Sequence, residues 1–380
     1  MKKIGILTYF SGVNPGTYLQ ALSVYRSVRK VYPNDFVEII NYRYFVDAKR
    51  PCFSSSSLRS LYNDFCKIRK YHICESQLPL SKNKLLSSNY QSAISFIIKQ
   101  NYDVIYVGSD TTLELFRAPD DEITPFWLSE EVQAKKIFIA ASARGTDFKD
   151  LSNSQKDKLT NALNSFDAIS VRDEATKRLM NALIGTDKNI VKLSDPTFAF
   201  DIDYSYADIY VKSKKLDLVK RPLICLHLIR DMKHKDEFCK LLKNHGYTIA
   251  SLRAARYVDI LVNDLSPFEF AGIFKYFDVL LTNRFHDTVF SIKNDTPVIT
   301  FPTAQYYQNA NGESKHSSLL SDFGLLDTNF IPNINELSPN EIYQKIDLVR
   351  ETMTLRRMEI LKLKSIERQK IESFLFENKY

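Results

Sequence analysis

The chain has 380 residues, of which 44% are hydrophobic and 26% charged, and this balance excludes a disordered or fibrous protein. Its length predicts two domains, and its net charge of +7 favours anionic partners. The sequence has no nucleic-acid-binding motif and no glycine-rich nucleotide loop, so we expect no nucleic-acid partner.

Apolar runs alternate with segments of helical spacing along the first half of the chain. The expected strands lie within 3–9, 36–42, 102–110, 135–145, 166–176 and 189–201. The expected helices cover 17–30, 89–99, 153–165 and 174–183. The region 43–90 is less regular, contains a serine run and many basic residues, and is interpreted as a solvated excursion or a membrane contact.

The second half repeats this alternation after a segment without periodicity, 201–220, which we interpret as a linker. The expected strands lie within 221–231, 247–255, 277–281 and 297–301. Helices are expected at 235–245, between the last two strands, and after Ser266, a candidate N-cap followed by Pro267. The last forty residues read as a long charged helix.

Strands that alternate with helices predict an α/β fold of two doubly wound, Rossmann-like domains that face a cleft. We expect an N-terminal domain over 1–205 with a basic excursion at 43–88, and a C-terminal domain over 206–335. The helical segment 336–380 is expected to pack back across both domains. Ligands of such folds bind beyond the carboxyl ends of the strands, so the polar residues at those ends are the candidate site residues.

Arg284 and His286 stand where an expected strand passes into a helix. With Thr282 or Asn283 as the cap, the open helix start and the two side chains would bind a carboxylate or a phosphate. The alternative is a surface Arg284 paired with Asp287 and a partly buried, structural histidine.

Other strand ends carry weaker signals, and each has a purely structural alternative. These are Gly16 before the first helix, Ser109 and Asp110 after Gly108, Arg172 before the cap residue Asp173, and Asp195, for which a structural turn is favoured. His227, His234 and His245 share no metal-ligand spacing and are interpreted as structural or surface residues. The DID sequence at 201–203 is a weak candidate for a metal site, and we expect no metal.

The segment LTNRFHDTVFSI resembles the T-x-[RS]-[FL]-H-x-[TA] signature of the polysaccharide pyruvyltransferase family. NPGTYLQAL, VGSD, IAASARG, ISVRDEAT, LSDPTFAF and SKHSSLLSDFGLL follow the order of further family motifs, from about residue 3 to 330. The chain departs from the family in Asp287, where glycine is frequent, and in TTLEL after GSD, where many members carry Gln and Trp.

The resemblance implies a GT-B-like, two-domain fold and transfer of the pyruvyl group of phosphoenolpyruvate to sugar hydroxyls as a ketal. Phosphoenolpyruvate is then a co-substrate and no cofactor is needed. The resemblance implies that Arg172, Arg284 and His286 hold phosphoenolpyruvate and act in catalysis, and we expect Asp110 to be catalytic as well. We expect donor binding by Arg172, Arg284, His286, Thr288, Gly16, Lys315 and His316, and acceptor binding by Asn14, Ser109, Asp110 and Arg144.

A bound anion should raise the pKa of His286, so that it donates a proton to the donor, while Asp110 or Asp287 accepts the hydroxyl proton. Two alternatives remain open. One is a GT-B glycosyltransferase with a nucleotide-sugar donor, and the other is a non-catalytic protein that holds a membrane or a partner through its basic region 43–84. We expect a cytoplasmic protein, because no signal peptide or apolar span is present and the five cysteines are scattered. A peripheral contact of the basic region with the inner membrane face is an open alternative.

Overall fold

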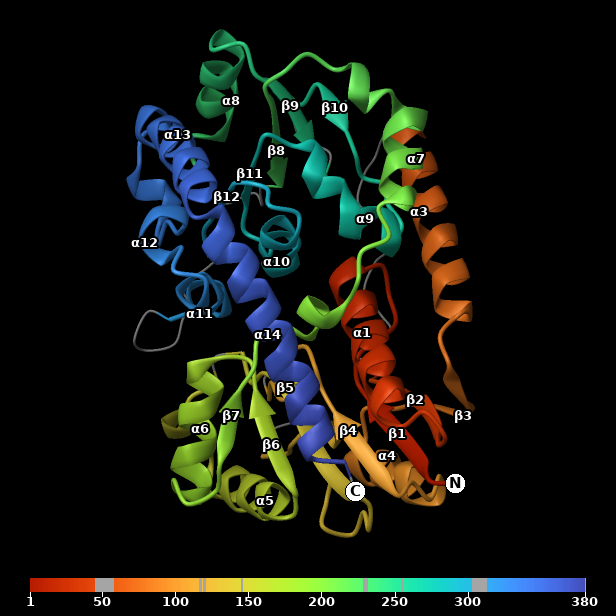
Figure 1. Cartoon of the computed structure of the whole chain (residues 1–380). Coiled ribbons are helices and arrows are strands. Elements are labelled where there is room, and N and C mark those ends of the chain that lie inside the picture. Colours follow the sequence, from red (N-terminus) through yellow and green to blue (C-terminus); the bar gives the residue numbers. More distant parts are fainter. Residues whose placement is uncertain are drawn as a thin grey trace.

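The computed structural model of the chain describes residues 1–44, 58–115, 118, 121–144, 146–227, 232–253, 256–302 and 313–379, and only the backbone of 58–60. Two parallel sheets form within these residues (Figure 1). The first contains β1 (Lys3–Leu7), β2 (Phe36–Arg43), β3 (Leu80–Leu86), β4 (Val104–Val107), β5 (Lys135–Ala141), β6 (Ala168–Val171) and β7 (Ile190–Lys192). The second contains β8 (Leu223–His227), β9 (Thr248–Ser251), β10 (Ile260–Leu261), β11 (Val279–Thr282) and β12 (Val298–Thr300).

The strand order reverses once in each sheet. The first sheet has the order β3-β2-β1-β4-β5-β6-β7 and the second β10-β9-β8-β11-β12. The chain therefore changes direction between β1 and β4 and again between β8 and β11, which is the doubly wound topology expected from the sequence. Crevices for ligands open beyond the strand ends at such reversals, so two candidate binding edges are present.

Helices cover both sheets, and their starts carry the expected signals. The helices of the first half are α1 (Pro15–Val31), α3 (Leu58–Ser76), α4 (Tyr90–Lys99), α5 (Asn153–Asn164) and α6 (Glu174–Ile184). Those of the second half are α7 (Ser205–Lys214), α8 (Lys235–Asn244), α9 (Pro267–Ile273), α10 (Phe285–Lys293), α11 (Lys315–Asp322) and α12 (Leu326–Asn329). Ser266 caps α9 through a capping box with Glu269, as its position before Pro267 predicts.

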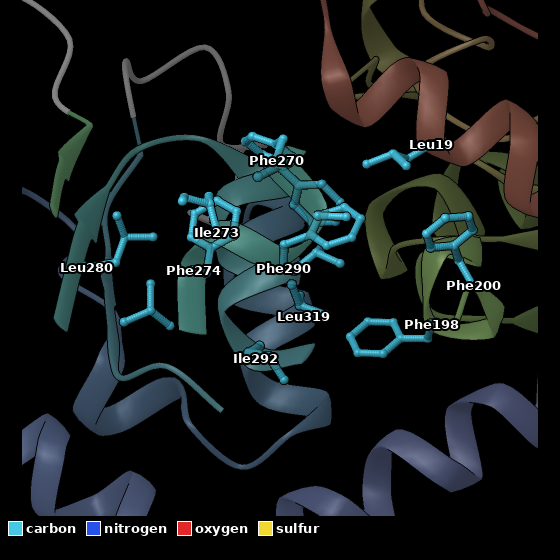
Figure 2. Close-up of a cluster of buried hydrophobic side chains, with 14 of the residues drawn as sticks. Leu19, Phe198, Phe200, Phe270, Ile273, Phe274, Leu280, Phe290, Ile292 and Leu319 are labelled. Atoms are coloured by element: carbon cyan, nitrogen blue, oxygen red, sulfur yellow. The ribbon is translucent and has the colours of Figure 1, made fainter. Parts of the chain in front are cut away.

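One apolar cluster joins the two halves. Figure 2 shows Leu19 of α1, together with Phe198 and Phe200, beside the second-half rings of Phe270 and Phe290. All five side chains are buried, and the Phe270 and Phe290 rings meet edge to face at 5.6 Å. Buried apolar area stabilises this contact at about 25 cal/mol per Å². The two sheets are therefore held in a fixed arrangement by a shared core.

The C-terminal segment consists of two successive helices, α13 (Pro339–Leu355) and α14 (Arg357–Glu377). α14 runs from the second sheet down across the first (Figure 1). Along this path Lys364 pairs with Asp295 at 2.6 Å and Arg368 pairs with Asp201 at 2.5 Å. These contacts tie the last helix to the segment before the second sheet and to the turn between α10 and β12.

Two segments that the sequence analysis expected to be irregular form helices or a strand in the structure. Residues 58–86 of the expected basic excursion are α3 and the edge strand β3, and only residues 45–57 of that region lie outside the described part of the chain. The expected linker 201–220 contains α7, which packs on α9, so its lack of periodicity did not mean a lack of structure. None of the described helices has the length and apolar character needed to span a membrane.

Candidate active site

A cavity of about 890 Å³ lies at the carboxyl ends of the strands of both sheets. It is lined by loops that follow β1, β4 and β11, by the end of β8, and by one face of α3 and the start of α11. The expected site residues that line it are Asn14, Asp110, Arg144, Arg284, His286, Lys315 and His316. The two chain reversals thus contribute to one common site.

Asp195 is the centre of a buried network under this cavity. Its carboxylate accepts hydrogen bonds from Gln20 at 2.5 Å, from Arg172 at 3.1 Å, and from the hydroxyl of Thr197 at 2.6 Å. Burial acts to raise the pKa of Asp195, but His286, Arg172 and Thr197 outweigh it and hold the pKa below its usual value. The carboxylate therefore stays charged and fixes the position of Arg172.

His286 reaches across from the second half to this network. Its Nε2 lies 3.8 Å from a carboxylate oxygen of Asp195, and its ring packs against the backbone of Gly16. A Cβ on Gly16 would lie 2.0 Å from Nδ1 of His286, so only glycine permits this approach. The role of Gly16 is therefore to make room for the imidazole, while its own N–H is capped by Asn14.

Asp110 is the second buried carboxylate of the site. Thr17 donates a hydrogen bond to it at 2.9 Å. Burial opposes its ionisation, yet the charges of Arg172, His286 and Lys315 lower the pKa of Asp110 to about 2. Asp110 is therefore ionised at neutral pH.

Two cations flank the ring of Phe285. The guanidinium of Arg172 lies 4.7 Å and the Nζ of Lys315 4.9 Å from the ring centre. Nε and Nη2 of Arg172 are buried and have no hydrogen-bond partner among the described residues. Burial and the charge of Arg172 lower the pKa of Lys315 to about 8. These donors make the site suited to an anion.

Arg284 is exposed at the cavity wall and occupies the N-cap position of α10, where Thr282 or Asn283 was expected. Its N–H donates to the hydroxyl of Thr282 at 3.0 Å. The alternative pairing with Asp287 is wrong, because that carboxylate bonds to Nδ1 of His227 at 2.5 Å and accepts from Thr282 at 2.8 Å. The Arg284 guanidinium has no ion-pair partner among the described residues.

The model of the polysaccharide pyruvyl transferase family matches residues 14–305, which is most of the chain. The chain belongs to this family. It is a transferase of polysaccharide synthesis, as the order of motifs in the sequence predicts. No curated protein matches it.

Three solved structures share the fold at low sequence identity. UDP-GlcNAc 2-epimerase from Neisseria meningitidis bound to UDP-GlcNAc has a TM-score of 0.54 and 10% identity, over 99% of this chain and 100% of that one. S. aureus MnaA with UDP has a TM-score of 0.51 and 9% identity, over 93% and 91% of the chains. Anabaena Alr3699/HepE with UDP-glucose has a TM-score of 0.51 and 10% identity, over 98% and 100%. Such likeness establishes the GT-B-like fold alone, and the expected fold class is confirmed.

The structure separates the expected site residues of this pyruvyl transferase into three groups. Ser109 and Thr288 are fully buried and do not line the cavity, and the Thr288 hydroxyl bonds to the Arg284 carbonyl and to Thr300. Arg144 lines the cavity but pairs with Glu114 at 3.0 Å. The remaining expected residues lie in the cavity or directly beneath it.

His316 is buried in the cavity wall, and its ring meets that of Phe285 edge to face at 5.7 Å. Burial, reinforced by the charge of Lys315, lowers the pKa of His316 to about 3. Burial likewise lowers the pKa of His286 below its usual value, despite the raising effect of Asp195 and Asp110. Both imidazoles are therefore neutral near pH 7 without a ligand, whereas the sequence analysis expected a protonated His286 with a bound anion.

The sequence analysis underrated several residues of the site. Asp195, favoured there as a structural turn, organises the buried network, and Gln20 was not considered. His227, interpreted as structural or surface, lines the cavity at the end of β8. Its position just after an apolar run was the same signal that identified Arg284. Lys67 of α3 also lines the cavity, where burial lowers its pKa.

The described residues include no group of three or more histidine, cysteine, aspartate or glutamate side chains arranged to hold a metal ion. In the DID segment, Asp201 pairs with Arg368, and Asp203 accepts a hydrogen bond from the hydroxyl of Ser205 at 2.6 Å. Both carboxylates are thus engaged in structural contacts.

Proposed function

We propose that this pyruvyl transferase uses phosphoenolpyruvate as its donor and forms a ketal on a sugar of a polysaccharide or of its precursor. The observation that supports the proposal is a set of cationic groups around His286 whose hydrogen-bond donors are not all used within the described part of the protein. Arg172 keeps two donors free although it pairs with Asp195, Arg284 has no paired carboxylate among the described residues, and Lys315 lines the cavity. A small ligand with a carboxylate and a phosphate matches this set.

The lowered pKa of His286 suggests how donor binding and proton transfer are linked. Without a ligand, burial keeps the imidazole neutral. A bound trianionic or dianionic donor would raise its pKa, since a nearby negative charge favours the protonated form. His286 would then take up a proton with the donor and pass it to C3, the vinyl carbon.

A nucleotide-sugar donor is the second candidate. The related N. meningitidis, S. aureus and Anabaena structures contain UDP or UDP-sugars, and a cavity of about 890 Å³ has room for a ligand of that size. In this case Arg284 and Lys315 would face a diphosphate instead.

Ligand-induced thermal stabilisation separates the two donors. We expect phosphoenolpyruvate to raise the melting temperature in a concentration-dependent manner. At a concentration of a hundred times its Kd, the free energy of unfolding should rise by about 2.7 kcal/mol. Arg284→Ala should lose most of this shift, and Arg350→Ala, which removes an exposed arginine from α13, should keep it. Stabilisation by UDP-glucose or GDP-mannose but not by phosphoenolpyruvate would replace the proposal with the second candidate.

We further infer that the protein works at the cytoplasmic face of an anionic membrane, where α3 makes the contact. Leu61, Tyr62, Phe65 and Ile73 are exposed on α3, and Lys67 and Tyr71 of the same helix line the cavity. An exposed apolar face with flanking basic residues favours interfacial binding. Phe65→Ser should reduce co-sedimentation with phosphatidylglycerol vesicles, and unchanged binding would refute this contact.

A further inference from the structure

Two histidines lie at the same edge of the second sheet but contact different residues. His227 ends β8 and stands in register with Thr282 of β11. His286 and Asp287 follow in the first turn of α10. His286 contacts Gly16 and approaches Asp195, both from the first half, whereas Asp287 contacts His227.

His227 is held in one orientation by two linked hydrogen bonds. Its Nδ1 lies 2.5 Å from Oδ2 of Asp287, and the Thr282 hydroxyl donates to the same oxygen at 2.8 Å. Asp287 is 2% exposed and is engaged by both partners, so its carboxylate is not free to meet a substrate. Both residues line the cavity, but the side chain of His227 is 16% exposed and that of Asp287 only 3%, so the imidazole is the more accessible part of this pair.

We propose that His227, oriented by Asp287, is the base that removes a proton from the attacking sugar hydroxyl. The inference rests on the proposed function, because it assigns the acceptor side of the same reaction. At the observed distance, the Asp287 carboxylate can accept a hydrogen bond from Nδ1–H of His227. That tautomer leaves the lone pair on Nε2, the nitrogen that remains for the cavity, and the carboxylate stabilises the imidazolium that forms.

The proton balance gives the two histidines separate tasks. The acceptor hydroxyl loses its proton to Nε2 of His227 while its oxygen bonds to C2 of phosphoenolpyruvate and C3 gains a proton from His286. The bond between C2 and the phosphate oxygen then breaks, and the phosphate leaves with the proton that His227 holds. A second hydroxyl attacks C2, and its proton restores His286, so both imidazoles return to their first state.

A purely structural role is the competing explanation, since a buried histidine–aspartate pair can simply join β8 to α10. Chemical rescue separates the two roles. A general base that acts through Nε2 can be replaced by free imidazole in His227→Ala, whereas a lost structural contact cannot restore turnover in this way. General base catalysis is typically worth about 10² to 10⁴ in rate.

The experiment measures phosphate release from phosphoenolpyruvate, with a panel of p-nitrophenyl hexosides and with glycerol as acceptors. We expect His227→Ala to lower kcat by about 10² to 10⁴, with the stabilisation by phosphoenolpyruvate kept and kcat partly restored by imidazole. Asp287→Asn should also lower kcat, because an amide can donate to Nδ1 and favour the wrong tautomer. His234→Ala, which removes an exposed histidine beside α8, serves as the control.

Three results would overturn the inference. The first is a kcat of His227→Ala within about threefold of the wild type. The second is a loss of turnover without imidazole rescue, which indicates a structural role. The third result can be measured without an acceptor. It is a ¹⁵N spectrum of histidine-labelled protein that shows the proton of the His227 imidazole on Nε2 at neutral pH. Wild-type protein that is neither stabilised by phosphoenolpyruvate nor releases phosphate from it contradicts the proposed function instead.

Discussion

The two chain reversals that meet at the cavity differ in how completely their polar groups are paired. At the carboxyl ends of the first sheet, Asp110 after β4 and Asp195 after β7 are buried, and each accepts a hydrogen bond from α1, through Thr17 and Gln20. At the β8/β11 edge, Arg284 is exposed, and Nε2 of His286 is buried without a hydrogen-bond partner among the described residues.

This difference indicates a division between scaffold and ligand-binding groups. The carboxylates of the first half are satisfied before any ligand arrives, because buried charges are costly unless they are paired. Arg284 and Nε2 of His286, in the second half, have no such partner among the described residues and would gain one from a bound anion. Variants on the first side should therefore change stability, and variants on the second side should change activity.

His286→Ala should have the largest effect and should act on turnover. We expect kcat for phosphate release to fall by about 10² to 10⁴, with little change in melting temperature, because general acid assistance is lost. His245→Ala removes a histidine that stacks on Tyr343 at 4.3 Å and is the matched control. Near-normal turnover of His286→Ala would remove this histidine from the mechanism.

Asp195→Ala should mainly lower the stability of the protein. The change leaves the guanidinium of Arg172 buried without its carboxylate, and breaking such a pair costs about 3–5 kcal/mol of unfolding free energy. Denaturant unfolding measures this loss, and Asp203→Ala, at an exposed carboxylate, should lose much less. A small change in Asp195→Ala would contradict the view of this edge as a scaffold.

Gly16→Ala tests the contact between the two edges. The added methyl group meets the ring of His286, and accommodating it should cost about 1–3 kcal/mol and displace the imidazole. We expect turnover to fall, with crystallography showing a rotated His286. Gly12→Ala is the control for the steric effect of an added methyl group, because no atom lies within 4 Å of a Cβ at this position. The positive φ of Gly12 adds backbone strain to this variant. Full activity in Gly16→Ala would show that the close approach is dispensable.

The pH dependence of stability should reflect the lowered pKa of His316. Burial lowers its pKa to about 3 in the folded state, while the unfolded chain binds a proton near pH 6.5, so stability is present above 6.5 and falls on acidification. Through His316 alone, the free energy of unfolding should fall by about 2 kcal/mol between pH 7 and pH 5. His316→Phe should flatten the curve by that amount, and His234→Ala should not. Parallel curves for wild type and His316→Phe would contradict the pKa shift.

The sequence predicted the parallel sheets because buried strands appear as short apolar runs between amphipathic helices. It failed at α3, because Leu61, Tyr62, Phe65 and Ile73 are exposed there and blur the helical pattern. Arg284 and His286 could be found from their place after a strand. The role of Asp195 could not, because its partner Gln20 is 175 positions away in the chain and reaches it only through the tertiary fold.

The central claim is that Arg172, Arg284 and His286 bind phosphoenolpyruvate at this cavity, and a crystal structure of the complex tests it most directly. We predict that its carboxylate and phosphate are bound by Arg172 and Arg284, with His286 within hydrogen-bond distance of the donor. A donor bound outside the cavity, with Arg284 and His286 turned away from it, would contradict the account.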